Sequence, residues 1–501
     1  MPSTQWLGRA GAVADVSTIT VGGSWAGTET VTITINGKDL VVTIGSLIST
    51  AQVATTIQEA FEGDTITDST GSVIPSTGKS GFAEHSQLTA TVSASVVTLT
   101  ANTAGEPWVV SDHLAPALST GTAQGGTAST IQLAAAETYS DDEINGHIVE
   151  ILGGVGAGQW RFITNYTGAS DTADISPDWD TNPDATSEYS IRKCAVQVST
   201  DSAAGTVVLA PSTRATGPNH VDNADNWDAG EIPGATGSTT AYIGNSSVSL
   251  LYGYMDFSET LTSFNVEKSF SADIGLPRTN ATGYPEFRPH YQRVESSAIR
   301  LKGGDGPGSG RVKIDSVDIA TAITVEDTGS GLETGLGAFI WKGTHASNTL
   351  HVTAGSVSVA PFDGETATLT TIHIATGTVV AGDAVTNTTV TNTGGEYTTS
   401  NTITTLKTGP GSTTTILGSM AVTTATAAGG TLIHRTSGTI TTLTLGGPTG
   451  ATLDCSQDVR ASKVITNMNL NAGGTIVDPQ RVLSLTNGIV VGTDVESVSA
   501  A

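Results

Sequence analysis

The sequence predicts a mostly β protein: a C-terminal parallel β-helix, or β-solenoid, preceded by a small α+β domain and a small β-barrel or sandwich. Short β-type runs recur between glycines in the C-terminal half, at residues 368–374, 402–407 and 439–445. The glycines that punctuate these runs are spaced by 18, 16, 18 and 17 residues, and they are Gly377, Gly395, Gly411, Gly429 and Gly446. A short near-period of this kind is typical of stacked coils that bury apolar side chains against one another.

Charge is almost absent from this C-terminal array. Between Thr366 and His434 the only fully charged residues are Asp383, Glu396 and Lys407. Carboxylates are therefore too rare in the array to form a catalytic pair. Threonine suits exposed strand positions, because its hydroxyl can bond to neighbouring strands while the surface stays uncharged. We therefore expect a stiff shaft here rather than an active surface.

The composition of the whole chain excludes several classes of protein. Its 501 residues suffice for about three domains, and low aromatic and charged contents with 59 glycines favour strands and tight turns over helical bundles. The net charge of −26 disfavours binding to nucleic acid or to an anionic membrane surface. No apolar run approaches the length, roughly 18 residues, that a membrane-spanning helix needs. We expect neither a nucleic acid partner nor membrane insertion.

Cofactor and metal chemistry finds no support in the sequence. Cys194 and Cys455 are the only cysteines, and neither belongs to a CxxC motif. The nine histidines form no HExxH pair, and no GxSxG motif has a His/Asp companion. The N-terminus lacks the architecture of a signal peptide, so we expect synthesis and folding in a cytoplasm. We expect no cofactor.

The N-terminal part begins with a leader arm, residues 1–16, in which Trp6 and Arg9 are candidate anchors to a neighbouring surface. An α+β attachment domain of ββαββ order is predicted over 17–113. Its first hairpin, 30–44, turns at Asn36-Gly37, the strongest short hairpin signal. A helix follows, with Ser49 and Gln52 at capping-box spacing, and it ends at Gly63. A second hairpin, 88–92 with 96–100, completes the unit.

A Ser/Thr/Gly/Ala-rich linker, 114–128, leads to the predicted barrel or sandwich at 129–195, whose five short strands lie at 130–133, 147–152, 159–166, 172–176 and 188–192. The glycine-rich run 153–159 lacks the GlyLysSer/Thr end of a phosphate-binding loop and opens no helix. A hairpin loop is therefore the better interpretation of this run.

A linker and solenoid cap is predicted at 196–239, because Pro211, Pro218 and Pro233 interrupt it. Within it, Trp227 lies between carboxylates, a pattern that suits a sugar-stacking platform. Alternatively, Trp227 plugs the open end of the solenoid, whose first coil would otherwise expose an apolar face. We favour the plug. The solenoid itself is predicted over 240–490, with a polar C-terminal tail at 491–501.

The most aromatic and basic patch of the chain lies at 283–293. Tyr284, Phe287 and Tyr291, together with Trp341, are candidate contacts to a partner or a glycan. An inserted loop packed on the solenoid is the commoner case for such a patch.

The sequence offers only weak candidates for the pair of carboxylates that glycoside hydrolysis requires. Asp315 and Asp318 lie three residues apart, so they face opposite sides of a strand. Glu326 and Asp327 are most simply a solvated corner. We therefore predict that the protein is not an enzyme.

Several segments resemble modules of virion structural proteins of tailed bacteriophages, of fibre or decoration type. These segments are GlnTrpLeuGlyArgAlaGlyAlaValAla at 5–14, GlyValGlyAlaGlyGlnTrpArgPheIleThrAsnTyr at 154–166, the Asp-Trp-Asp run at 178–189, and AsnTrpAspAlaGlyGluIlePro at 226–233. The resemblance implies small N-terminal β-rich modules followed by a β-helix. It implies no site at the level of residues.

The resemblance and the composition together predict a non-enzymatic virion protein. Its N-terminal modules attach to the particle, and the acidic solenoid projects outward as a capsid decoration, head fibre or tail fibre. The expected partners are other virion proteins and further copies of the chain, with a homotrimer preferred. We expect localisation in the virion after assembly in the host cytoplasm. The alternatives are a tailspike that binds or degrades a host surface glycan in an aromatic, acid-lined cleft near 283–345, and a bacterial surface adhesin.

Overall fold

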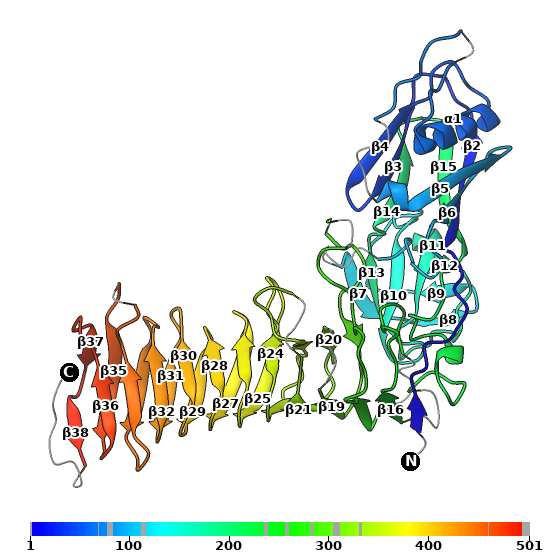
Figure 1. Cartoon of the computed structure of the whole chain (residues 1–501). Helices are drawn as coiled ribbons and strands as arrows, with labels where there is room; N and C mark the ends of the chain where they lie inside the picture. The colour runs from blue at the N-terminus through cyan, green and yellow to red at the C-terminus, as the bar shows by residue number, and fades with distance from the viewer. Residues whose placement is uncertain are drawn as a thin grey trace.

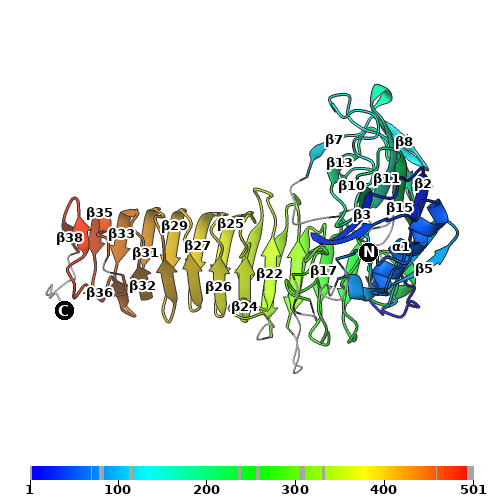
Figure 2. The ribbon, with the colours of Figure 1, turned by 90° about the horizontal axis from the view of Figure 1, so that it is seen from above.

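The computed structural model describes residues 3–492, apart from 69, 78–83, 112–116, 235–238, 256–259, 281–282, 284, 304–310, 330–332 and 459. The chain is mostly β, as predicted, and its C-terminal part is a solenoid of about 11 turns. Figures 1 and 2 show a straight rod with the two small domains gathered at its N-terminal end. No helix in the described part of the chain combines the length and apolarity that crossing a membrane requires.

The first domain contains two antiparallel sheets and one α-helix. The sheet orders are β15-β2-β6-β5 and β14-β3-β4, and α1 packs on β2, β4, β5 and β6. The bounds of these elements are β2 (Val16–Gly23), β3 (Thr30–Ile35), β4 (Lys38–Thr43), α1 (Thr50–Glu62), a 3-10 turn (His85–Gln87), β5 (Leu88–Ser93), β6 (Val96–Ala101), β14 (Val196–Thr200) and β15 (Gly205–Thr213).

Local sequence determines the hairpin and the helix of this domain. Asn36 and Gly37 both have positive φ, 48° and 71°, as the tight turn between β3 and β4 requires. Ser49 and Gln52 form the predicted capping box, and Gly63 ends the helix in the left-handed conformation. The apolar stripe of α1 is buried in the domain core.

Replacement of Ser49 by alanine removes the side-chain acceptor for the backbone N–H of Gln52. We expect the first domain to lose about 1 kcal/mol of unfolding free energy, the usual cost of an N-cap. Urea unfolding followed by circular dichroism measures this loss. Thr55→Ala, at a partly exposed position of the same helix, is the matched control and should not destabilise the domain, because alanine favours helix. An equal loss in both variants would contradict the capping role.

Strands β14 and β15 belong to the first domain, whereas the sequence predicted a linker there. β14 pairs with β3 and β15 pairs with β2, both antiparallel, and each lies at the edge of its sheet. The second domain is therefore inserted into the first. Pro211 accounts for the difference, because proline interrupts strand patterns and is tolerated on edge strands. It lies beside a register shift in β15.

The second domain is one seven-stranded antiparallel sheet of order β7-β13-β10-β11-β12-β9-β8. Its strands are β7 (Ser119–Thr122), β8 (Gly125–Thr127), β9 (Thr130–Gln132), β10 (Ile148–Gly153), β11 (Trp160–Thr167), β12 (Thr172–Ser176) and β13 (Glu188–Arg192). The strands β7 and β8 lie in the predicted linker 114–128, which is therefore partly sheet. The glycine-rich run 153–159 connects the antiparallel pair β10 and β11, so it is a hairpin loop.

The solenoid is built from two parallel sheets, to which successive turns contribute strands. The larger sheet contains β1 (Ser3–Gln5), β16 (Thr240–Ile243), β17 (Ser263–Val266), β19 (Ala298–Lys302), β21 (Ala322–Asp327), β23 (Thr349–Val352), β25 (Ala367–Ile374), β27 (Val385–Asn392), β29 (Ile403–Thr408), β31 (Val422–Ala427), β33 (Thr439–Leu445), β35 (Lys463–Leu470), β37 (Leu483–Leu485) and β38 (Ile489–Val491). The smaller sheet contains β18 (Gln292–Arg293), β20 (Val312–Asp315), β22 (Phe339–Lys342), β24 (Ser356–Val359), β26 (Thr378–Ala381), β28 (Glu396–Thr399), β30 (Thr413–Ile416), β32 (Gly430–His434), β34 (Ala451–Asp454) and β36 (Gly474–Val477).

The stacking register explains the near-period of the sequence. Threonines occupy equivalent positions on five successive turns, with steps close to the glycine spacing, and they are Thr371, Thr389, Thr405, Thr424 and Thr442. The next residue of each strand points inward, and the resulting buried column is Ile372, Val390, Leu406, Ala425 and Leu443. Each turn therefore buries its apolar side chains against its neighbours, while partly or fully exposed threonines line the outside.

Candidate functional site

The N-terminal end of the solenoid is closed by two tryptophans. The indole rings of Trp6 and Trp227 are fully buried in the solenoid core and meet edge to face, with centroids 5.1 Å apart. Their Nε1 atoms donate hydrogen bonds to the carbonyls of Val248 and Val221, both at 2.9 Å. Trp227 therefore plugs the first turn, and its ring offers no face to a sugar. Trp6 anchors to its own chain, in place of the predicted external surface.

The leader continues the solenoid sheet at its open edge. β1 pairs in parallel with β16, the first solenoid strand after the small domains. The backbone N–H of Gln5 and the hydroxyl of Thr4 both donate to Oδ1 of Asp228, at 2.7 and 3.1 Å. Arg9 stays exposed, and its Nε donates to the carbonyl of Asp225 at 3.0 Å. The leader is therefore a cap rather than a free arm. Of its two predicted anchor residues, Trp6 and Arg9, only Arg9 remains accessible.

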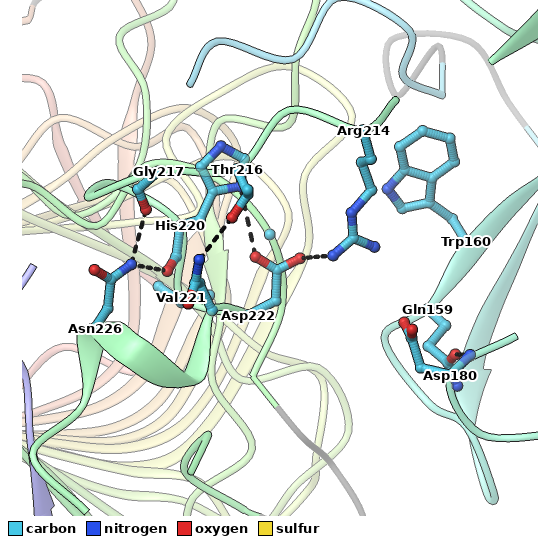
Figure 3. A network of polar contacts seen from close by, with 12 residues as sticks. Gln159, Trp160, Asp180, Arg214, Thr216, Gly217, His220, Val221, Asp222 and Asn226 are labelled. Carbon is cyan, nitrogen blue, oxygen red and sulfur yellow. Dashed lines mark hydrogen bonds and ion pairs between the residues drawn. The ribbon is translucent and has the colours of Figure 1, made fainter. Parts of the chain in front are cut away.

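A polar network joins this cap to the first domain (Figure 3). Asp222 lies between Arg214, whose Nη2 is 2.7 Å from its Oδ2, and His220, whose Nδ1 is 3.5 Å from its Oδ1. Burial opposes ionisation of Asp222, but the hydrogen bond from His220 and the charge of Arg214 lower the pKa of its carboxyl overall. Nε2 of His220 reaches the carbonyl of Gly105 in the first domain at 2.9 Å. The Asp222 carboxylate, held by Arg214 and His220, therefore belongs to the network that joins the solenoid cap to the first domain.

Replacement of Asp222 by alanine should weaken this junction. The change leaves Arg214 and the buried His220 without their carboxylate partner, and we expect a loss of about 2 kcal/mol because the network is only partly shielded from solvent. Thermal unfolding measures the loss, and small-angle scattering would reveal a broader distribution of angles between rod and domains. Asp225→Ala, a neighbouring exposed carboxylate, is the control. Unchanged unfolding and scattering of the Asp222 variant would contradict the role of the network.

Two of the cavities in the described part of the chain bear on a possible binding site. One, of about 50 Å³, is lined by Trp160, Arg214, Tyr252 and Arg288 among others, and it has room for only a few water molecules. The other is a groove of about 630 Å³ between the second domain and the side of the solenoid. This volume lies in the usual range for small-molecule sites, which occur preferentially at domain interfaces.

The groove brings together aromatic rings and charges of both signs. Its lining residues include Ala117, Arg192, Arg278, His290, Tyr291, Asp315, Lys342, Phe362, Asp363 and Glu365. The hydroxyl of Tyr291 donates to Oε2 of Glu365 at 2.9 Å. Nζ of Lys342 lies 4.7 Å from the Tyr291 ring centroid and 3.4 Å from Oδ2 of Asp315. Burial raises the pKa of the Glu365 carboxyl, and the charge of Lys342 opposes that rise.

The groove contains one of the predicted aromatic contacts, Tyr291. Phe287 is instead buried against Val110 and Ala195, so its ring is closed to a partner. Trp341 is fully buried inside the solenoid, with its Nε1 bonded to Oγ of Ser316 at 3.1 Å. The prediction that Phe287 and Trp341 contact a partner or a glycan is therefore wrong, because both side chains are buried. Tyr284 lies outside the described residues.

The carboxylates considered for glycoside hydrolysis separate in the structure. Asp315, at the end of β20, lines the groove, whereas Asp318, Glu326 and Asp327 are exposed and do not line it.

Phe362 and Glu365, on the turn after β24, were missed by the sequence analysis. One signal could have located the groove: residues 278–342 contain eight of the 21 lysines and arginines. Within the described residues, no three metal-ligating side chains gather as a metal site.

In comparisons with protein-family models, with curated proteins and with solved structures, no match to this chain was found.

Proposed function

We propose that this chain is a non-enzymatic structural protein of a tailed-phage virion. Its two small domains attach to the particle, and the solenoid projects outward as a capsid decoration, head fibre or tail fibre. The observation that carries the proposal is the arrangement of the parts: both domains sit at one end of a straight rod (Figures 1 and 2). With about 11 turns and the usual spacing between strands, the rod extends roughly 50 Å.

The surface of the rod supports the same proposal. Threonine columns follow the outside of successive turns, and the array has few charges on which a ligand or nucleic acid could be held. Such a surface suits a soluble spacer. The partners in this proposal are other virion proteins and two further copies of the chain, side by side in a trimer.

Labelling of intact particles tests the proposal. Antibodies against the solenoid, visualised with gold by electron microscopy, should decorate purified virions either on the head or on the tail. Absence of the chain from purified virions, measured by mass spectrometry, would refute the virion proposal. Native mass spectrometry of the purified chain tests the trimer separately, and a monomer at micromolar concentration would refute that part alone.

The groove supports a second candidate function, that of a tailspike which binds or cleaves a host glycan. Tyr291 supplies an aromatic ring, while Asp315 and Glu365 supply two carboxylates in different environments. Incubation of the purified protein with host capsule or lipopolysaccharide tests cleavage. Shortened glycan chains would establish a tailspike that cleaves glycan. Unchanged chains would exclude cleavage, and a binding measurement would then test the glycan-binding form of the candidate.

A further inference from the structure

We infer that the groove between the second domain and the solenoid binds a saccharide that carries a single carboxylate, such as a uronic acid unit. The inference deepens the glycan-binding candidate and rests on it, but it does not depend on the virion assignment. It names the chemical class of the ligand from the charges and hydrogen-bonding groups of the lining.

The first step concerns charge. The groove is lined by three cationic side chains, Arg192, Arg278 and Lys342, and by three carboxylates, Asp315, Asp363 and Glu365. Local charge is therefore close to balanced in a chain whose net charge is −26. An anion that the rest of the surface repels can approach here.

The second step identifies the group that would hold the anion. Arg192 and Lys342 already face the carboxylates of Glu150 and Asp315, at 3.5 and 3.4 Å. Arg278 is exposed and makes no ion pair with any described residue. Its guanidinium stacks over the ring of Phe362, 4.3 Å from the centroid, which orients the planar fork. A fork of this kind binds a carboxylate through two parallel hydrogen bonds.

The third step concerns the remainder of the ligand. Ionised carboxylates only accept hydrogen bonds. Glu365 already accepts from the Tyr291 hydroxyl and from the backbone N–H of Phe362, whereas the exposed Asp363 is open to a donor from a ligand. Sugar hydroxyls are such donors, and the partly exposed ring of Tyr291 offers apolar surface to a pyranose. Three carboxylates would repel a phosphate dianion or a sulfated polyanion. A hydroxyl-rich monoanion satisfies both sets of groups.

Isothermal titration calorimetry on the full chain at low salt tests the inference with four ligands. These are a short oligosaccharide that contains glucuronate, the matching glucose oligosaccharide, glucose 6-phosphate, and cyclohexanecarboxylate, which has the carboxylate without hydroxyls. We expect the glucuronate ligand to bind at least tenfold more tightly than each of the other three. Arg278→Gln should weaken its binding at least tenfold, whereas Arg300→Gln, an exposed arginine of β19 outside the groove, should not.

The outcomes separate the inference from the function on which it rests. Equal binding of the glucose and glucuronate ligands would overturn the inference and leave glycan binding in place. Tighter binding of glucose 6-phosphate or of cyclohexanecarboxylate would show that the ligand class is wrong. Binding of none of the four would refute the inference together with the glycan-binding candidate. Arg278 is exposed, so its variant should fold, and an unchanged thermal midpoint would verify this.

Discussion

Replacement of Trp6 by alanine is expected to detach the leader and to cost about 3–5 kcal/mol of unfolding free energy, the usual penalty for removing a buried large aromatic side chain. The indole of Trp6 fills the first turn against Trp227, and its loss leaves a cavity that the stacked strands cannot close. The released leader also uncovers the edge of β16. An exposed parallel edge invites pairing with another chain, so we expect association that depends on concentration. Chemical unfolding and light scattering after size-exclusion chromatography measure the two effects.

Two variants control this experiment. Tyr242→Ala changes an aromatic residue of β16 that is 39% exposed, and it should cost far less. Trp6→Phe preserves a ring in the cavity and should retain much of the stability. A double-mutant cycle with Trp227→Ala should give a coupling on the order of 1 kcal/mol, because the two rings touch. If Trp6→Ala unfolds like the unaltered protein and stays monodisperse, the capping role is wrong.

Acidification from pH 7 to pH 4.5 is expected to destabilise the solenoid through His434. The imidazole is completely buried at the end of β32. Burial and the nearby charge of Lys463 lower its pKa from 6.5 to about 4. The folded state therefore keeps the ring neutral, and its stability is fully present above pH 6.5 and is lost as the pH falls toward 4. Full protonation would cost about 3 kcal/mol.

The variant His434→Leu isolates this contribution from other titrating groups. It should remove most of the pH dependence between 6.5 and 4.5, measured as the difference in thermal midpoint between the two pH values. His351→Leu, at an exposed histidine of the same rod, should retain it. If His434→Leu remains as sensitive to acid as the unaltered protein, another titrating group causes the destabilisation.

The solenoid could be predicted because the sequence pattern that specifies it is local. Each turn repeats the same small pattern, so the spacing of the glycines nearly reproduces the register steps between paired strands. The hairpin at Asn36-Gly37 and the capping box at Ser49 were predicted for the same reason. A few neighbouring residues fix the backbone conformation there.

The insertion could not be predicted, because its determinants lie far apart in the sequence. Val196 pairs with Ile35, and the long segment between them, which includes the whole second domain, gives no sign of the contact. Burial of Trp227 was ambiguous for a related reason. Flanking carboxylates are typical of an exposed ring, but Asp228 is used to receive the leader, which comes from the other end of the N-terminal region. The groove likewise draws its residues from several turns and from the second domain.

The inserted arrangement of the two small domains also constrains the order of events during synthesis. The second domain is continuous in sequence and can fold as soon as Arg192 has left the ribosome. The first domain must wait for β14 and β15, although most of it was translated earlier. At usual elongation rates, synthesis as far as Thr213 takes on the order of ten to forty seconds. During that interval the nascent chain carries two unpaired sheet edges, on β2 and β3, which are the segments that a chaperone would be expected to cover.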